Sequence, residues 1–441
     1  MLFTHRAAAQ TAAALYAFTT SPTAGPAAAV VIGKNGNLFG TTKYIGAFGD
    51  GSVFELSPPT APEQPWTEKT LYSFTGQNGD GQSPVSDLVV GPGGIFYGTT
   101  SYGGDSVCIA HGCGTVFQLT PPAAPGGTWT ETIIHSFTGQ DGDGFNPESG
   151  LIMEPNGVLY GTTSGGGLTT SACPYSCGMV FQLSPPLAPG GGWKETILYQ
   201  FTGQGGDGAN PWGSLALSGG VLYGTTLRGG SGACNYFGQS GCGTVFELSP
   251  PTTKGGAWTE KVLHKFTGYD SDGASPVGGV IVDSGGALYG TTAYGGANEC
   301  AIRTGSPGCG TVFQLTPPAM AGGAWTESLL YSFKGLAGCC FGDGATPMAA
   351  VTFVPDGTLY GTTYNGGEPC TTQDTTGCGT VFWLTPPAMP GGAWSEATIS
   401  LLVQKTGVGP LGALVMGPQG TLYGTTSGDD ISDGTVFALL P

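Results

Sequence analysis

Leu159-Tyr-Gly-Thr-Thr163 is followed by Gly178-Met-Val-Phe181 and then by Trp193-Lys-Glu195, and this succession of three phrases recurs along the chain. The first phrase occurs seven times, as LFGTT, FYGTT or LYGTT, beginning at Leu38, Phe96, Leu159, Leu222, Leu288, Leu359 and Leu422. Successive copies begin 58 to 71 residues apart, and 441 residues divided by seven gives 63. The chain is therefore built from seven repeats, and the repeat decides the fold.

Each repeat contains four segments of strand length, which we call A, B, C and D. Segment A is a short apolar stretch after a proline, B is the LYGTT phrase, C is the GTVF-like phrase, and D runs from Trp-x-Glu into an LYSF-like sequence. The segments are rich in Val, Phe, Tyr and Thr, and clusters of Gly and Pro separate them. Four short strands in each repeat predict a β-propeller, in which every repeat forms one blade.

The number of D segments indicates how the ring closes. Segments A, B and C occur seven times, whereas Trp-x-Glu occurs six times, and the last repeat stops after its C segment. The N-terminal sequence Ala14-Leu-Tyr-Ala-Phe18 matches the second half of D, so it can supply the missing outer strand. An open β-solenoid, the alternative architecture, has no reason for such a split between the two ends of the chain.

We therefore predict an all-β fold, a seven-bladed β-propeller of four-stranded blades whose ring is closed by an N-terminal outer strand completing blade 7. The whole chain forms one domain, with the outer strand of blade 7 at 13–19 and the blades at 26–74, 84–137, 147–201, 211–266, 276–333, 347–402 and 410–440. In this packing we expect Gly161 and its equivalents to let a neighbouring blade approach closely.

The composition excludes several classes of protein. Asp and Glu outnumber Lys and Arg by 29 to 12, giving a net charge of −17, so the basic surface that binds nucleic acid is missing. No run of about 18 apolar residues occurs, so we expect no membrane span. The sequence also lacks common catalytic motifs such as His-Glu-x-x-His and the phosphate-binding loop that ends in Gly-Lys-Ser/Thr.

The combined phrases LYGTT, GTVF-x-L-x-PP and W-T-E-x-x-LYSF resemble the GloVer repeat of bacterial secreted and surface proteins, and the resemblance covers nearly the whole chain. It implies bacterial origin, export and tandem repetition, without an established activity or catalytic residue. The chain ends at Leu440-Pro441 without a hydrophobic tail or sorting signal, and no export signal is evident at its start. We therefore expect either a freely secreted protein or a truncated sequence.

The twelve cysteines indicate the compartment. Ten of them form five pairs within the loops between B and C, namely Cys108/Cys113, Cys173/Cys177, Cys234/Cys242, Cys300/Cys309 and Cys370/Cys378. We predict a disulfide in each loop, because a bridge offsets the entropy that a long loop loses on ordering. The four histidines do not supply the spacing of a zinc site. Disulfides predict an extracellular or cell-surface protein. Cys339 and Cys340 are adjacent, and a vicinal disulfide, free thiols and other pairings remain open for them.

Five of the loops from D to the next A, the D–A loops, carry an Asp-Gly at the same place, at Asp80, Asp143, Asp207, Asp272 and Asp343. Two residues before three of them stand Asn78, Asp141 and Asp270, which resembles the start of a calcium loop. The alternative is an Asx turn, in which the aspartate bonds its own backbone and the glycine takes a positive φ. Calcium, best held by Asp141 and Asp143, is the one cofactor that we consider.

In a propeller the D–A and B–C loops lie on the same face, which is the natural binding face. The channel opens there beside the residues that follow the proline of each A segment, including Glu148 and Trp212 of neighbouring blades, with Asp87 near the same rim. A carboxylate beside an indole can hold a sugar, although the indole can also simply fill the mouth of the channel. We predict a non-catalytic, monomeric scaffold that binds a glycan, a peptide or a cell-surface partner. The alternative is a secreted carbohydrate-active hydrolase or lyase with its site at the channel mouth.

Overall fold

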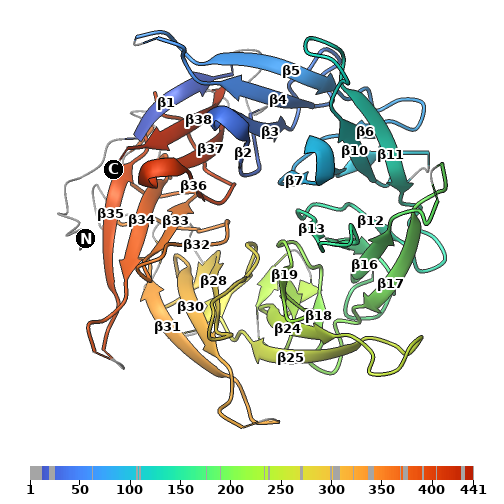
Figure 1. Ribbon diagram of the computed structural model, residues 1–441. Helices are drawn as coiled ribbons and strands as arrows, with labels where there is room; N and C mark the ends of the chain where they lie inside the picture. The colour runs from blue at the N-terminus through green and yellow to red at the C-terminus, as the bar shows by residue number, and fades with distance from the viewer. Residues whose placement is uncertain are drawn as a thin grey trace.

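The computed structural model describes residues 12–18, 25–61, 63–105, 108, 111–174, 176–188, 190–232, 234–236, 239–268, 272–297, 300, 308–320, 322–335, 342–367, 369–370, 376–389, 392–403, 405–428 and 433–440. Seven four-stranded sheets stand around a central channel (Figure 1). The described residues contain no α-helix, only strands and the 3-10 turns η1 (Lys34–Gly36), η2 (Pro92–Gly94) and η3 (Pro418–Gly420). The predicted seven-bladed, all-β propeller is confirmed.

Each blade runs from a short inner strand A to a long outer strand D. The A strands are β2 (Val31–Ile32), β7 (Val89–Val90), β13 (Ile152–Met153), β19 (Ala216–Ser218), β27 (Ile281–Val282), β32 (Thr352–Phe353) and β36 (Val415–Met416). The B strands are β3 (Leu38–Thr42), β8 (Phe96–Thr100), β14 (Leu159–Thr163), β20 (Val221–Thr226), β28 (Leu288–Thr292), β33 (Leu359–Thr363) and β37 (Leu422–Gly428). The C strands are β4 (Ser52–Ser57), β10 (Thr115–Thr120), β16 (Met179–Ser184), β24 (Thr244–Ser249), β30 (Thr311–Thr316), β34 (Thr380–Thr385) and β38 (Asp433–Leu439). The D strands are β5 (Thr67–Ser73), β11 (Thr130–Ser136), β17 (Lys194–Gln200), β25 (Thr259–Lys265), β31 (Thr326–Ser332), β35 (Ser395–Leu401) and β1 (Ala12–Ala17).

The N-terminal strand β1 completes the blade that the last repeat begins. It pairs antiparallel with β38, with Ala13 opposite Ala438, and the register shifts at Leu15 to form a β-bulge. The other D strands have the same bulge, for example at Leu71 of β5. In Figure 1, β1 at the blue end of the colour range lies beside β38 at the red end. The first described strand therefore has the local geometry of a D strand.

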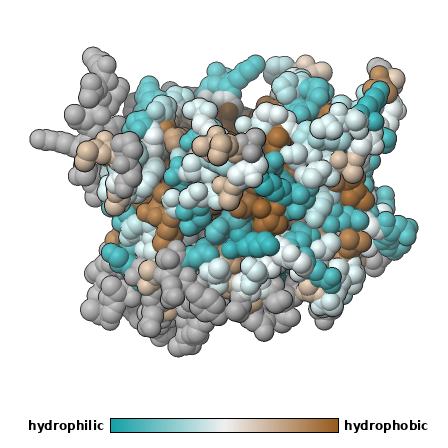
Figure 2. All heavy atoms as spheres, turned by 90° about the horizontal axis from the view of Figure 1, so that it is seen from below, coloured by the Kyte–Doolittle hydropathy of each residue, from teal (hydrophilic) through white to brown (hydrophobic). Residues whose placement is uncertain are grey.

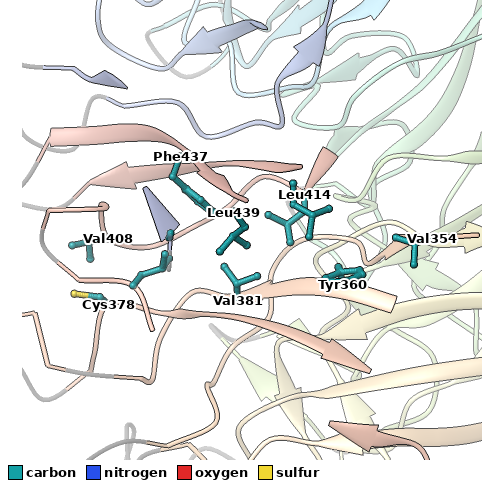
Figure 3. Close-up of a cluster of buried hydrophobic side chains, with 11 residues drawn as sticks. Val354, Tyr360, Cys378, Val381, Val408, Leu414, Phe437 and Leu439 are labelled. Atoms are coloured by element: carbon teal, nitrogen blue, oxygen red, sulfur yellow. The ribbon is translucent and has the colours of Figure 1, made fainter. Parts of the chain in front are cut away.

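Phenylalanines fill the interfaces between blades. At six interfaces, the phenylalanine at the end of a D segment meets the C-strand phenylalanine of the next blade edge to face, with ring centroids 5.0–5.2 Å apart. One of these pairs is Phe18 and Phe54, which joins the blade of β1 to blade 1. At the interface of blades 6 and 7, Leu402 takes the place of the first ring and packs in the cluster around Phe437 and Val381 (Figure 3).

The glycine of the LYGTT phrase lies against its own blade. A Cβ at Gly161 would lie 2.6 Å from Phe181 Cζ and 2.9 Å from Leu151 Cδ2, and all three residues belong to blade 3. The expectation that this glycine admits a neighbouring blade is therefore wrong. The glycine instead leaves room for the ring of Phe181, its cross-strand partner in the ladder between β14 and β16.

The first threonine of the same phrase ties neighbouring blades together beside the channel. Thr41 Oγ1 of blade 1 donates a hydrogen bond to Ser86 O of blade 2 at 3.2 Å. The same bond joins blade 7 to blade 1, where Thr425 Oγ1 donates to Ala28 O at 2.8 Å. Because these bonds lie at the inner edges of the blades, they hold the channel wall in a fixed shape.

The D–A and B–C loops lie together on one face, as the sequence predicts. They pair in short two-stranded ladders, namely β6 (Gly81–Gln82) with β9 (Tyr102–Gly103), β12 (Gly144–Phe145) with β15 (Gly165–Gly166), β18 (Gly208–Ala209) with β21 (Arg228–Gly229), and β26 (Gly273–Ala274) with β29 (Tyr294–Gly295). A further hairpin, β22 (Asn235–Tyr236) with β23 (Gln239–Ser240), lies within one B–C loop.

The five predicted loop disulfides are confirmed. The bonded pairs are Cys108–Cys113, Cys173–Cys177, Cys234–Cys242, Cys300–Cys309 and Cys370–Cys378, with Cα atoms 4.9–5.5 Å apart. Each bridge closes a single B–C loop, so none of the five links two blades.

The outer surface carries apolar side chains in separate patches between hydrophilic ones, as the view in Figure 2 shows. The most exposed large apolar side chains are Leu187, Met320 and Met389, which lie in loops between C and D strands. No helix in the described part of the chain is long and apolar enough to cross a membrane.

Candidate functional site

The mouth of the central channel forms a pocket of about 430 Å³. Residues that follow the proline of an A segment line it from all seven blades: Ala27, Val85, Glu148, Trp212, Val277, Met348 and Leu411. Asp87 lines it as well, so the structure brings together the three side chains that the sequence placed at the rim. Most of the remaining wall is glycine, alanine and serine, which brings backbone polar groups close to the pocket.

Asp87 lines the pocket and also forms a hydrogen bond between two blades. Its Oδ1 accepts a hydrogen bond from Ala29 N at 2.6 Å, which ties blade 2 to blade 1. Burial raises the pKa of the Asp87 carboxyl, and the bond from Ala29 opposes this shift. The A segments vary too much in sequence to predict such a bond between blades.

Glu148 lies at the mouth of the pocket with a cation nearby. Burial raises the pKa of Glu148, while the Ser164 hydroxyl and the Lys43 ammonium group act in the opposite sense. Lys43 lines the same pocket and is a candidate site residue that sequence reasoning missed. The sequence feature that could have identified Lys43 is its position directly after LFGTT. The other repeats have uncharged residues there: Ser101, Ser164, Leu227, Ala293, Tyr364 and Ser427.

Trp212 differs from the tryptophans of the Trp-x-Glu phrase. Its side chain is 40% exposed and lines the pocket. The motif tryptophans instead pack against other side chains of the ring, as Trp193 does against Tyr97 of the preceding blade, with centroids 5.8 Å apart. An exposed indole at the rim of a concave site is available to a ligand.

The five aspartates of the D–A loops are hydrogen-bonded within their own loops. Asp80 Oδ2 accepts bonds from Thr75 N at 2.8 Å and Thr75 Oγ1 at 2.7 Å, and its Oδ1 accepts a bond from Gly81 N at 2.7 Å. Backbone N–H groups of the equivalent loops bond in the same way to Asp143, Asp207, Asp272 and Asp343. These aspartates therefore order the loops, but the bonds of Asp80 run to Thr75 and Gly81 and not two residues further on, as they would in an Asx turn.

The glycine after this aspartate has a steric role. The positive φ values fall earlier in the loop, at Asn78 (55°) and Gly79 (85°), and Gly81 is not among the left-handed residues. The expected positive φ is therefore wrong at Gly81, whereas Gly344, after Asp343, has a φ of 117°. A Cβ at Gly81 would lie 2.5 Å from Thr100 Cγ2, so the close approach of the B strand requires glycine there.

The calcium candidates are only partly brought together. Asn78 and Asp141 are exposed, each two residues before an aspartate that is bonded to its own loop. Asp270 lies outside the described residues, as do Cys339 and Cys340. Calcium binding by the D–A loops stays a prediction.

The glutamate of the Trp-x-Glu phrase meets the Asp-Gly loop of the preceding blade, a contact that sequence reasoning did not find. Burial and the charge of Asp80 raise the pKa of Glu131 to about 8. Burial and the charge of Asp143 raise the pKa of Glu195 to about 7. The regular recurrence of this glutamate was the signal that it has a fixed structural partner.

Solved structures of similar fold include two enzymes at low sequence identity. A fungal alcohol oxidase of the AA5 family, in complex with copper, is 13% identical, with 98% of this chain and 76% of that chain covered and a TM-score of 0.51. A polysaccharide lyase, an ulvan lyase with a bound saccharide, is 10% identical, with 99% and 96% covered and a TM-score of 0.50. This likeness shows the fold alone. No curated protein matches the chain.

The sequence model of the Gloeobacter/Verrucomicrobia repeat matches the chain three times, at residues 1–235, 110–302 and 232–441. These matches overlap and together span the chain, in agreement with the seven copies of the LYGTT phrase. The resemblance seen in the sequence phrases is thereby confirmed, and the chain belongs to the Gloeobacter/Verrucomicrobia repeat family.

Proposed function

We propose that this chain is a non-catalytic binding protein that holds a glycan in the pocket at the channel mouth. The observation that carries the proposal is Trp212, a 40% exposed indole at a pocket lined mostly by small residues. An indole offers a flat apolar face to the C–H groups of a sugar ring. The carboxylate of Glu148 supplies acceptors, and Lys43 supplies a donor, for the sugar hydroxyls.

The size and rigidity of the pocket support this proposal. Its volume of about 430 Å³ lies within the range of about 300–1,000 Å³ that is usual for small-molecule sites. Bonds between blades, from Ala29 N to Asp87 and from Thr41 to Ser86 O, fix the wall. A preformed wall loses little conformational entropy when a ligand binds.

Charge favours a neutral or basic glycan over an acidic one. The chain has a net charge of −17. Among the described residues that line the pocket, Asp87 and Glu148 carry carboxyl groups and Lys43 is the single cation. A polysaccharide rich in carboxylates or sulfates would be repelled during its approach. Glycans built from neutral hexoses or amino sugars are therefore the expected ligands.

Substitution of Trp212 tests the proposal. A glycan array identifies the ligand, and calorimetry should then show at least a tenfold loss of affinity in Trp212→Ala, about 1.4 kcal/mol. Phe48→Ala is the matched control, because Phe48 is 63% exposed but does not line the pocket. Unchanged glycan affinity in Trp212→Ala, or binding of peptides and of no glycan, would contradict the proposal.

A carbohydrate-active hydrolase or lyase is the second candidate. Burial raises the pKa of both Asp87 and Glu148, which is the direction of shift that a general acid requires. The hydrogen bond that Asp87 accepts from Ala29 N favours a structural role for Asp87 over a catalytic one. Release of reducing ends from bound glycans by the wild type, lost in Glu148→Gln, would establish the enzyme. Its absence agrees with a binding protein.

We also propose an extracellular or cell-surface location. The five loop disulfides support it, since such bonds persist in oxidising compartments. Membership of a bacterial repeat family agrees with export.

A further inference from the structure

A second group of chemically active side chains lies between blades 2 and 3, away from the channel mouth. His135 comes from β11, Glu195 from β17, and Asp143 from the D–A loop that joins the two blades. One ligand atom from each residue, an imidazole nitrogen and two carboxylate oxygens, lies within 4.8 Å of the others. His135 Nε2 and Glu195 Oε1 are 3.7 Å apart, which is too far for a hydrogen bond.

Other blades show what this position does when it has no histidine. Tyr72 occupies it in blade 1, and its hydroxyl donates to Asp80 Oδ2 at 3.2 Å. Tyr199 of blade 3 bonds Asp207 Oδ2 at the same distance. The tyrosine hydroxyl thus bonds the aspartate of its own D–A loop, whereas His135 Nε2 at the same position forms no hydrogen bond.

His135 leaves polar atoms unused at this position. Among the described residues, His135 Nε2 is a buried atom without a hydrogen-bond partner. The same holds for Glu195 Oε1 and for the equivalent Oε1 atoms of Glu131, Glu260 and Glu327. The side chains of His135 and Glu195 are 19% and 18% exposed. The histidine at the equivalent position of blade 4 differs, because His264 Nε2 lies 3.2 Å from Asp272 Oδ1 and is engaged there. Of these two histidines, His135 is therefore the one whose Nε2 lies near two carboxyl groups without a hydrogen bond.

We propose that His135, Asp143 and Glu195 bind a divalent transition-metal ion, best zinc, which joins blade 2 to blade 3. Imidazole nitrogen and carboxylate oxygens are ligands that zinc takes at about 2.0–2.2 Å, which puts ligand atoms about 3.3 Å apart in a tetrahedron. The observed separations are 3.7 Å between His135 Nε2 and Glu195 Oε1 and at most 4.8 Å between any two ligand atoms, so the side chains must close by up to about 1.5 Å. Two carboxylates and a neutral imidazole balance the double charge of the ion.

Asp143 is already held in the orientation that such a site needs. Its Oδ2 accepts bonds from Thr138 N and Thr138 Oγ1, both at 2.7 Å, and its Oδ1 accepts a bond from Gly144 N at 2.6 Å. An ionised carboxylate has about four lone-pair positions, so it retains capacity for a metal. Bonds of this kind orient the ligands of known metal sites. The site includes a nitrogen ligand and does not use Asp141, so it differs from the calcium loop considered from the sequence.

The test uses the full chain after treatment with a chelator. Calorimetric titration with zinc should give one saturable site per chain that His135→Tyr and Glu195→Gln each weaken at least tenfold, since even changes beside a ligand cost about 10–100-fold. Tyrosine is tolerated at this position, because Tyr72 and His135 pack on the following phenylalanine in the same way, with rings 80° apart. The matched control is His264→Tyr, which should leave zinc affinity unchanged.

The melting temperature supplies a second measurement. Zinc should raise it in the wild type and in His264→Tyr but not in His135→Tyr, while the three proteins melt alike without metal. The proposal is overturned if the wild type binds no zinc at micromolar concentration, if His135→Tyr binds it as well as the wild type does, or if both histidine variants lose it equally. Binding of calcium in place of zinc would also overturn it.

Discussion

Gly161 illustrates how one hydrogen atom in place of a side chain sets the packing of a blade. A Cβ there would meet Phe181 Cζ at 2.6 Å and Leu151 Cδ2 at 2.9 Å. Gly161→Ala should lower the free energy of unfolding by about 1–3 kcal/mol, because the buried ring must shift. Chemical denaturation measures the loss. Gly192→Ala is the control, since no atom lies within 4 Å of a Cβ there, and equal losses in the two variants would contradict the packing account.

Residues of the candidate site were predictable where the circular arrangement of equivalent repeat positions is enough to bring them together. The residues after each A-segment proline meet at the channel, so Glu148 and Trp212 were found from their place in the repeat. Lys43 and the bond from Ala29 N to Asp87 were missed, because they depend on how side chains of different blades approach one another. The spacing of residues within one repeat does not predict which side chains of neighbouring blades come into contact.

At the scale of strands and loops, β11 and β25 each hold a glutamate against the D–A loop of the preceding blade. Burial and Asp80 raise the pKa of Glu131 to about 8, and burial and Asp207 raise that of Glu260 to about 7, from 4.5. Each group therefore binds its proton more tightly in the folded state. This contribution to stability is complete below about pH 4.5 and is lost as the pH rises to about 8.

The melting temperature should accordingly fall between about pH 5 and about pH 8.5, and it should fall less in the double variant Glu131→Gln/Glu260→Gln. The comparison between variants separates the effect of these two groups on the melting temperature from the effect of the net negative charge, which grows with pH. Glu63→Gln removes an exposed glutamate and should keep the slope of the wild type. If the double variant has that same slope, Glu131 and Glu260 do not control the pH dependence.

The strands were predictable because their sequence phrases recur six or seven times, and the disulfide loops because their cysteine pairs recur five times. The proximity of five of the six Trp-x-Glu glutamates to an aspartate was not predicted, since it joins segments of two blades. The metal-ligating potential of His135 was missed for the same reason. Its partners Asp143 and Glu195 lie 8 and 60 residues further along the chain and meet it only when the blades pack.

On the scale of the whole molecule, the two ends of the chain share one blade. The N-terminal strand β1 pairs with β38 and also contacts both neighbouring blades. On one side the ring of Phe18 packs against Phe54 of blade 1. On the other side Ala12 N donates a hydrogen bond to Ser400 Oγ of blade 6 at 3.2 Å. The count of D segments predicted this closure, because a ring of complete blades allows only one place for the spare strand. The central claim is that this strand closes the ring and so fixes the channel mouth.

Removal of residues 1–18 tests that claim most directly. The truncated chain leaves the edge of β38 unpaired and uncovers Phe54, and exposed strand edges associate. The account predicts a clearly lower melting temperature and self-association in size-exclusion chromatography, both reversed by a peptide of residues 10–20 added in trans. Phe18→Ala should reproduce part of the loss, about 3–5 kcal/mol in the free energy of unfolding. A truncated chain that elutes as a monomer and melts at the temperature of the wild type would contradict the closed ring.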